Sequence, residues 1–288
     1  MIYVRDNDSW RELHGAKVFE GSGWSEIGHG DKLFCNGRWY AVKEFVNESE
    51  ALTLTAADTG ETSVKLYIQG NPDISGLTYR TDKSAPFVPY TRDTEILLPS
   101  RGDYVQFYNT SDTFSTSGGN HIKFKTTGMI ACSGNVQSLL NFSPVCKPYC
   151  FYRLFSGCQL TSFPELPATV LASYCYCEMF LGATFDTGAT LKLPAEELVD
   201  GCYNEMFRNV SGSSLNLDVS FKKWPMRVYS DLNYVNCEGC TDGWVDDNRT
   251  GEGIIVHIAI PPELSVVYSN DAISTNGSST WRYKEEAE

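Results

Sequence analysis

Basic residues are scarce in this chain. It carries 23 lysines and arginines against 36 aspartates and glutamates, a formal net charge of -13. No cluster of lysine and arginine in the sequence offsets that charge. Because an acidic field of this size repels nucleic acid and anionic lipid surfaces, we expect neither of them to be a direct partner.

Long apolar runs are also missing. The longest apolar stretch lies near residues 253–261 and is far too short to span a bilayer. Charges interrupt residues 1–8 at once, and no apolar segment of the kind found in secretory signals follows them. The sequence therefore predicts a protein that is made and folded in a cytoplasm, with no membrane insertion.

The motifs of common enzymes are absent as well. The chain contains no G-x-S-x-G, Walker A, H-E-x-x-H or G-x-G-x-x-G pattern. Its four histidines, at positions 14, 29, 121 and 257, have no metal-ligand spacing. Carboxylates are numerous, but nothing singles out a pair for glycoside hydrolysis. We therefore expect no enzymatic activity, no catalytic residue and no cofactor.

Ten cysteines among 288 residues are too few for a disulfide-linked scaffold. A reducing place of synthesis predicts free thiols, which pack as small hydrophobic side chains. Cys237 and Cys240 have the spacing of half a zinc knuckle, and Cys146 with Cys150 would have to supply the other half. Because that second pair is spaced C-x3-C and Cys150 also belongs to a repeat described below, we predict no metal site.

Short strands and tight turns are what the composition favours. Gly, Ser, Thr and Asn are frequent, aromatic residues reach 13%, and stretches of helical period are absent. The first 45 residues contain three turn-forming segments, each ending in tryptophan: Arg5 to Trp10, Phe19 to Trp24 and Phe34 to Trp39. A two-residue loop places the first and last residues of each segment opposite one another. We therefore predict a β-hairpin meander over residues 1–47, whose pattern is similar to short attachment modules of phage tail and fibre proteins.

The middle of the chain also reads as strands and turns. The expected strands are 51–56, 63–68, 95–98, 104–109 and 122–125. Prolines at 86 and 89 favour a linker over residues 81–93. We therefore predict a β segment and linker over residues 48–92 and a β-sandwich-like module over residues 93–145.

A repeat occupies the centre of the chain. The segments Cys150 to Phe155, Cys175 to Phe180 and Cys202 to Phe207 follow one another at spacings of 25 and 27 residues. Leu166-Pro-Ala and Leu193-Pro-Ala are again 27 residues apart. A period of this length is typical of leucine-rich solenoids, in which neighbouring turns must stack to bury their apolar sides. We therefore predict leucine-rich-type repeats over residues 146–220.

Two sets of residues follow from this repeat. Equivalent positions should form internal ladders, so the predicted structural core is Cys150, Phe155, Leu166, Cys175, Phe180, Leu193, Cys202 and Phe207. Short strands before Leu-Pro should point their polar residues outward. If the array binds a ligand, the predicted face is Thr161, Ser162, Glu165, Thr190, Lys192, Asn216 and Asp218.

The repeat unit L-P-A-x-x-L-x-x-x-C-[FY]-x-x-[LM]-F resembles the BspA-like leucine-rich repeats. Such repeats occur in surface proteins of gut and oral anaerobic bacteria and in their phages. The lead-in at residues 128–140 and the closing segment at 261–268 with Trp281 are also similar, so the resemblance covers residues 93 to 285. It departs from the family in having two complete repeats and a partial third. It implies a mainly β protein with a short β/α or β/3-10 solenoid and a small C-terminal β cap over residues 221–288.

Together with the hairpins, the resemblance predicts a structural protein of a bacteriophage virion: a head fibre, a tail fibre or a tail-associated subunit. The expected partners are other virion proteins, further copies of the chain (a trimer above all) and a host-surface protein or glycan. A bacterial cell-surface adhesin with the same repeats is the alternative. A carbohydrate-active enzyme is a third hypothesis, which requires a carboxylate pair in a cleft lined by aromatic residues.

Overall fold

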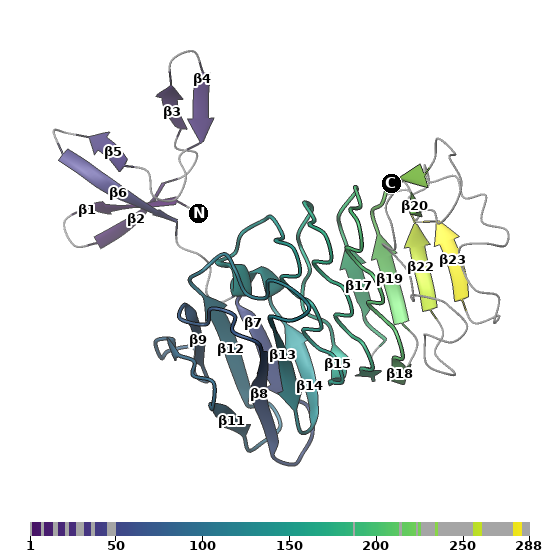
Figure 1. Ribbon diagram of the computed structural model, residues 1–288. Coiled ribbons are helices and arrows are strands. Elements are labelled where there is room, and N and C mark those ends of the chain that lie inside the picture. The colour runs from purple at the N-terminus through teal and green to yellow at the C-terminus, as the bar shows by residue number, and fades with distance from the viewer. Residues whose placement is uncertain are drawn as a thin grey trace. The chain divides into compact units, whose positions relative to one another are not determined.

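The computed structural model describes the backbone and side chains of residues 50–222, except 187, 213 and 214, and elsewhere the backbone of the strands β1–β6 and β20–β23. The described part is mainly β and contains no α-helix (Figure 1). No helix in it has the length and apolar character of a membrane-spanning segment. The chain divides into two compact units, Met1–Glu48 and Ser49–Glu288.

The first unit consists of antiparallel strands. They are β1 (Ile2–Asp6), β2 (Ser9–Leu13), β3 (Lys17–Glu20), β4 (Gly23–Glu26), β5 (Lys32–Cys35) and β6 (Arg38–Glu44). Four of them form a sheet in the order β2-β1-β6-β5, and β3 pairs with β4. As predicted, the registers place Arg5 opposite Trp10, Phe19 opposite Trp24 and Phe34 opposite Trp39.

The second unit begins with two sheets that pack face to face. The strands are β7 (Leu52–Ala56), β8 (Thr62–Gln69), β9 (Leu77–Arg80), β10 (Val88–Pro89), β11 (Glu95–Leu98), β12 (Tyr104–Asn109), β13 (His121–Thr126) and β14 (Met129–Ser133). One sheet has the order β11-β8-β13, and the other begins β10-β9-β12-β7-β14. Their inner faces share one core, in which the rings of Phe107 and Phe124 lie 5.1 Å apart.

Most side chains of the expected linker at residues 81–93 are exposed, but the segment also contains a short strand and one buried residue of this core. Its strand β10 pairs with β9. Tyr90 is 3% exposed, and its hydroxyl accepts a hydrogen bond from the Leu66 amide and donates one to the Thr94 carbonyl. The buried phenol therefore attaches the segment to β8 through Tyr90.

The larger sheet continues into the repeat region without a break. After β14 come β15 (Gln159–Ser162), β16 (Thr184–Phe185) and β18 (Ser211–Gly212), all parallel. The 3-10 helix η2 (Val136–Leu140) follows β14. Because β14 pairs with β7 on one side and β15 on the other, a single sheet spans the expected domain boundary at residue 145.

A second parallel sheet runs along the same region. It has the order β17-β19-β22-β23, formed by β17 (Thr190–Leu193), β19 (Leu215–Val219), β22 (Val256–Ile260) and β23 (Ser279–Tyr283). The strands β20 (Trp224–Pro225) and β21 (Tyr234–Val235) pair separately. Strand β17 buries alternate residues, because Leu191 and Leu193 face the core while Thr190 and Lys192 are exposed.

Three turn segments, at residues 147–158, 172–183 and 199–210, stack on one another beside these sheets (Figure 1). Within each segment every second N–H donates to the carbonyl three residues earlier. In the first two segments the intervening N–H groups donate to the following segment; Phe151 donates to Cys175 at 2.9 Å, and Tyr176 to Cys202 at 2.8 Å. The backbone polar groups of each segment are thus satisfied partly by the next segment.

Each turn segment contains a residue of positive φ at every fourth position. These residues are Tyr149, Arg153 and Gly157, then Tyr174, Glu178 and Gly182, then Gly201, Glu205 and Asn209. Glycine and asparagine adopt this left-handed conformation most readily. The regular recurrence gives the three segments the same path.

Aromatic ladders fill the interior between segments. Phe155 stacks on Phe180 at 5.7 Å, and Phe180 stacks on Phe207 at 5.8 Å. Phe124 of β13 begins this ladder, 5.3 Å from Phe155. A second ladder runs through Phe151, Tyr176, Tyr203 and Phe221. The stacked segments and the two-sheet core therefore form one continuous hydrophobic cluster.

Candidate functional site

The residues predicted to form one ligand face lie on two different sheets. Thr190 and Lys192 stand on β17, and the register places Asn216 and Asp218 of β19 directly beside them. Thr190 and Lys192 are exposed, and Asn216 and Asp218 are partly exposed. The structure thus brings four of the seven residues together, in a row that combines hydroxyl, amide, ammonium and carboxylate groups.

The other three predicted residues lie on or just after β15 of the larger sheet. The Ser162 hydroxyl donates to the Cys132 carbonyl at 2.6 Å, and the Thr161 hydroxyl donates to the Ile130 carbonyl at 3.4 Å. These bonds lie at an irregularity in the β14–β15 pairing. Glu165 is exposed and forms a β-bridge with Asn135. Two of the three side chains therefore stabilise the sheet and do not offer their hydroxyl protons to a ligand.

The eight residues predicted for the repeat core are all buried. Leu166 is 3% exposed, and the other seven are fully buried. Cys150 donates through its thiol to the carbonyl of Cys175, and Cys175 donates to that of Cys202, at 3.9 and 3.8 Å. The cysteines at equivalent positions thus form a ladder of their own beside the aromatic ones.

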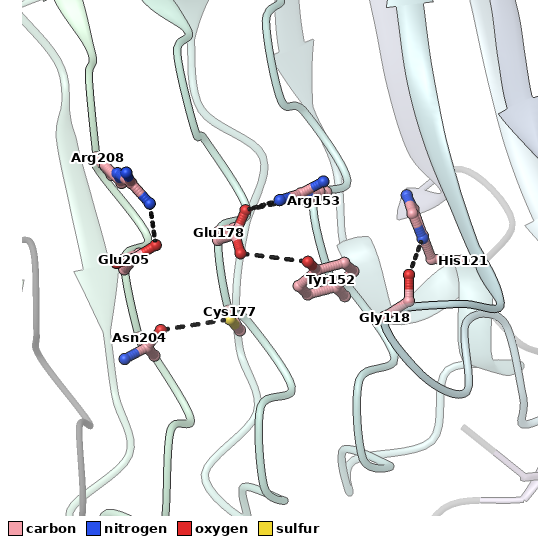
Figure 2. Close-up of polar contacts among 9 residues, drawn as sticks. All are labelled: Gly118, His121, Tyr152, Arg153, Cys177, Glu178, Asn204, Glu205 and Arg208. Carbon is pink, nitrogen blue, oxygen red and sulfur yellow. Dashed lines mark hydrogen bonds and ion pairs between the residues drawn. The ribbon is translucent and has the colours of Figure 1, made fainter. Parts of the chain in front are cut away.

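A polar row across the turn segments was missed at the sequence level. Figure 2 shows its centre, where the Glu178 carboxylate accepts hydrogen bonds from Arg153 Nε at 2.6 Å and from the Tyr152 hydroxyl at 3.2 Å. In the following segment Arg208 Nη1 lies 2.8 Å from Glu205 Oε2. The signal for this row was present, because residues 153, 178 and 205 share the 25- and 27-residue spacings of the repeat.

Beside this row, Tyr149 and Tyr174 stack at 5.0 Å with nearly parallel rings. The third equivalent position is Gly201, where an added Cβ would lie 2.3 Å from the Tyr174 ring. The Tyr174 ring is therefore covered by Tyr149 on one face and by the backbone of Gly201 on the other. Neither face of this ring is free to stack on a sugar.

The electrostatics of the polar row do not favour proton transfer. Burial, with the nearby Glu178 charge, raises the pKa of Tyr152 to about 12. Burial also lowers the pKa of His121, whose Nδ1 lies 2.9 Å from the Gly118 carbonyl oxygen (Figure 2). His121 is only 1% exposed and packs edge-on against Tyr152 at 5.1 Å. The histidine beside this row thus lies beneath the surface.

The thiols are equally inaccessible. All seven cysteines in the described part of the chain are free and buried. Burial raises the pKa of Cys158, Cys177 and Cys202 to about 12 in each case. Cys146 is the exception, because hydrogen bonds from Cys150 and Cys175 lower its pKa to about 4. A reactive nucleophile at the surface is therefore not among the described cysteines.

The zinc-knuckle hypothesis joins two regions of the chain, of which the structure describes one. Cys146 and Cys150 are both buried, the first just before and the second within the first turn segment. Cys237 and Cys240 are outside the described residues. Within the described range, no three His, Cys, Asp or Glu side chains are grouped so that they could hold a metal ion.

Comparisons with family models, with curated proteins and with solved structures find no match for this chain.

Proposed function

We propose that this chain is a non-catalytic binding and assembly protein of a bacteriophage virion, a fibre or tail-associated subunit built on leucine-rich-type repeats. The observation that carries the proposal is the stack of three turn segments with equivalent backbone bonds and equivalent core residues. Such an arrangement produces a long surface from a short repeated sequence, and its stability is approximately a sum over neighbouring segments.

Residues at equivalent positions and the parallel strand pairing support the proposal of leucine-rich-type repeats. Cys150, Cys175 and Cys202 occupy the same place in successive segments, as do Phe155, Phe180 and Phe207. The parallel pairing of β15, β16 and β18, one strand from each passage of the chain, is the geometry expected of a solenoid. The likeness of the repeat unit to BspA-like sequences then favours a surface or virion role over a metabolic one.

The accessible chemistry supports binding over catalysis. The described thiols are buried, and the polar row at Glu178 is saturated by Arg153 and Tyr152. Thr190 and Lys192 of β17 are exposed, and Asn216 and Asp218 of β19 lie beside them and are partly exposed. We assign any contact of the repeats with a host-surface protein or glycan to these four residues.

The oligomeric state of the purified full-length chain tests the fibre assignment. Size-exclusion chromatography coupled to light scattering should give three times the 32.1 kDa mass of one chain, because closed symmetric assembly covers strand faces that a monomer leaves open. A protein that stays monomeric across the accessible concentration range would count against a fibre.

A bacterial cell-surface adhesin is the second candidate, and the four polar residues of β17 and β19 favour it equally. The two candidates differ in where the protein is found. Antibodies raised against the chain should label purified phage particles if it is a virion subunit, and the surface of uninfected cells if it is an adhesin. The double variant Lys192→Ala, Asp218→Ala should reduce host-surface binding in either case. Unchanged binding would show that these residues of β17 and β19 do not contact the host.

A further inference from the structure

The outer face of the sheet β11-β8-β13 gathers lysines that are far apart in the sequence. Strand β8 alternates, with Val64 and Leu66 buried and Lys65 and Tyr67 directed outward. The register places Lys125 of β13 opposite Lys65, and Lys123 opposite Tyr67. We call Lys65, Tyr67, Lys123 and Lys125 the lysine face.

Among the residues that the structure describes, no ion pair includes one of these lysines. Glu95 of β11 lies opposite Lys65, and its Oε1 accepts a hydrogen bond from the Ser63 hydroxyl at 2.9 Å. Two lysines directly opposite each other on neighbouring strands repel and cost stability. A local excess of positive charge thus stands on a protein whose net charge is -13.

Exposed apolar groups lie among the lysines. Tyr67 is 48% exposed, and Leu97 on the neighbouring strand β11 is 54% exposed. Lys123 Nζ lies 5.5 Å from the centroid of the Tyr67 ring. An exposed aromatic ring flanked by ammonium groups can pack against the C–H groups of a sugar while the lysines bind its acidic substituents.

We propose that the lysine face binds an acidic polysaccharide, with carboxylates of the glycan held by Lys65, Lys123 and Lys125 and one sugar ring packed on Tyr67. Neighbouring strands lie about 5 Å apart and alternate residues along a strand lie about 7 Å apart. The ammonium groups are therefore spread over a flat area that a sugar chain with widely spaced charges can follow. Nucleic acid carries denser charge and is repelled more strongly by the acidic remainder of the protein.

The lysine face includes no residue of the repeats and does not depend on the oligomeric state. Its binding of a glycan is therefore independent of whether the chain is a virion subunit, an adhesin or neither. Lysines on an exposed strand also discourage aggregation between sheet edges, and that simpler role predicts no ligand. Affinity electrophoresis of the full-length chain separates the two.

The native chain should be retarded in gels that contain polygalacturonate and should migrate normally in gels that contain neutral dextran. The triple variant Lys65→Gln, Lys123→Gln, Lys125→Gln should bind about thirtyfold more weakly, at about threefold for each exposed charge contact. Tyr67→Ala should weaken binding while leaving the net charge unchanged. Retardation should also fall steeply as salt is raised.

A matched variant controls for net charge. Lys83→Gln, Lys147→Gln and Lys222→Gln together remove the same three charges from other parts of the surface, and this variant should retain the native affinity. Equal losses in the two triple variants, or no retardation of the native chain by polygalacturonate, would overturn the proposal. Stronger retardation by an oligonucleotide or by an acidic polypeptide than by polygalacturonate would overturn the choice of a glycan.

Discussion

Gly201 is a position where the structure leaves no room for a side chain. It has a φ of +62°, and a Cβ added there would lie 2.3 Å from Cε1 and 2.5 Å from Cδ1 of Tyr174. Gly182 occupies a left-handed position in the preceding segment, with a φ of +66° and nothing within 4 Å of an added Cβ. The two glycines therefore share the backbone conformation and differ in the space around them.

Alanine substitutions at the two glycines therefore separate the energetic cost of the left-handed backbone conformation from the cost of the clash with Tyr174. Alanine in a left-handed conformation costs roughly 1–2 kcal/mol, and the stiffer unfolded chain returns roughly 0.4–1 kcal/mol. We therefore expect Gly182→Ala to lower the free energy of unfolding by about 1 kcal/mol. Gly201→Ala must also displace the Tyr174 ring from its stack on Tyr149, which adds about 2 kcal/mol of overpacking and lost ring contact.

Urea denaturation of the two variants, monitored by tyrosine fluorescence and circular dichroism, measures both costs. A double-mutant cycle with Tyr174→Ala isolates the clash, because without the ring Gly201→Ala should cost only about 1 kcal/mol, the same as Gly182→Ala. The Tyr174→Ala single variant supplies the baseline of the cycle. Equal destabilisation by Gly201→Ala and Gly182→Ala in the native background would refute the packing described for Tyr174.

Three further predictions concern the core and its ionisable groups. Phe180→Ala should lower the free energy of unfolding by about 4 kcal/mol, since that ring is fully buried. The control Phe87→Ala, at a half-buried edge, should cost about 1 kcal/mol in the same urea assay. Equal destabilisation by the two variants would contradict the stacking described for Phe180. Stability should fall as pH is lowered from the ordinary pKa of histidine through the depressed pKa of folded His121, because the unfolded chain binds a proton at this histidine more readily. His121→Gln should flatten this part of the profile of stability against pH. An unchanged slope would exclude His121 as its cause. Cys158 and Cys177, whose pKa values burial raises to about 12, should resist alkylation by iodoacetamide at pH 8 in the native protein and react after denaturation, as peptide mass spectrometry will report; rapid native labelling would show that the segments open readily.

Much of the fold could be predicted because short-range signals determine it. The two-residue turns fix the hairpin registers around Trp24 and Trp39 without help from the rest of the chain. The repeat spacing likewise identifies equivalent positions, so Cys175 and Phe180 could be assigned to the interior from the sequence alone. The expected strands 95–98 and 104–109 coincide with β11 and β12.

The remaining features depend on contacts between distant residues. The prolines at 86 and 89 are typical of a linker, yet the Tyr90 phenol finds its hydrogen-bond partner 24 residues earlier, at Leu66. The predicted ligand face divides between two sheets because β15 and β17 pair with different strands, which the repeat spacing alone does not reveal. The lysine face could not be predicted from the sequence either, because Lys65 and Lys125 come together only through the pairing of β8 with β13.

The backbone bonds between turn segments all run in one direction. Segment 147–158 donates to segment 172–183, which donates to segment 199–210, while the carbonyl of Leu154 in the first segment accepts from Phe124 of β13. Within the first two segments the intervening N–H groups thus face the next segment, and only at the segment ends do the carbonyls of Cys158 and Ala183 accept from the residues that follow it, Thr184 and Ser211. Gain or loss of one whole repeat leaves the backbone hydrogen bonds between neighbouring segments matched. Loss of half a repeat disrupts them on both sides of the deletion. We therefore expect natural variants of this chain to differ in length by whole repeats.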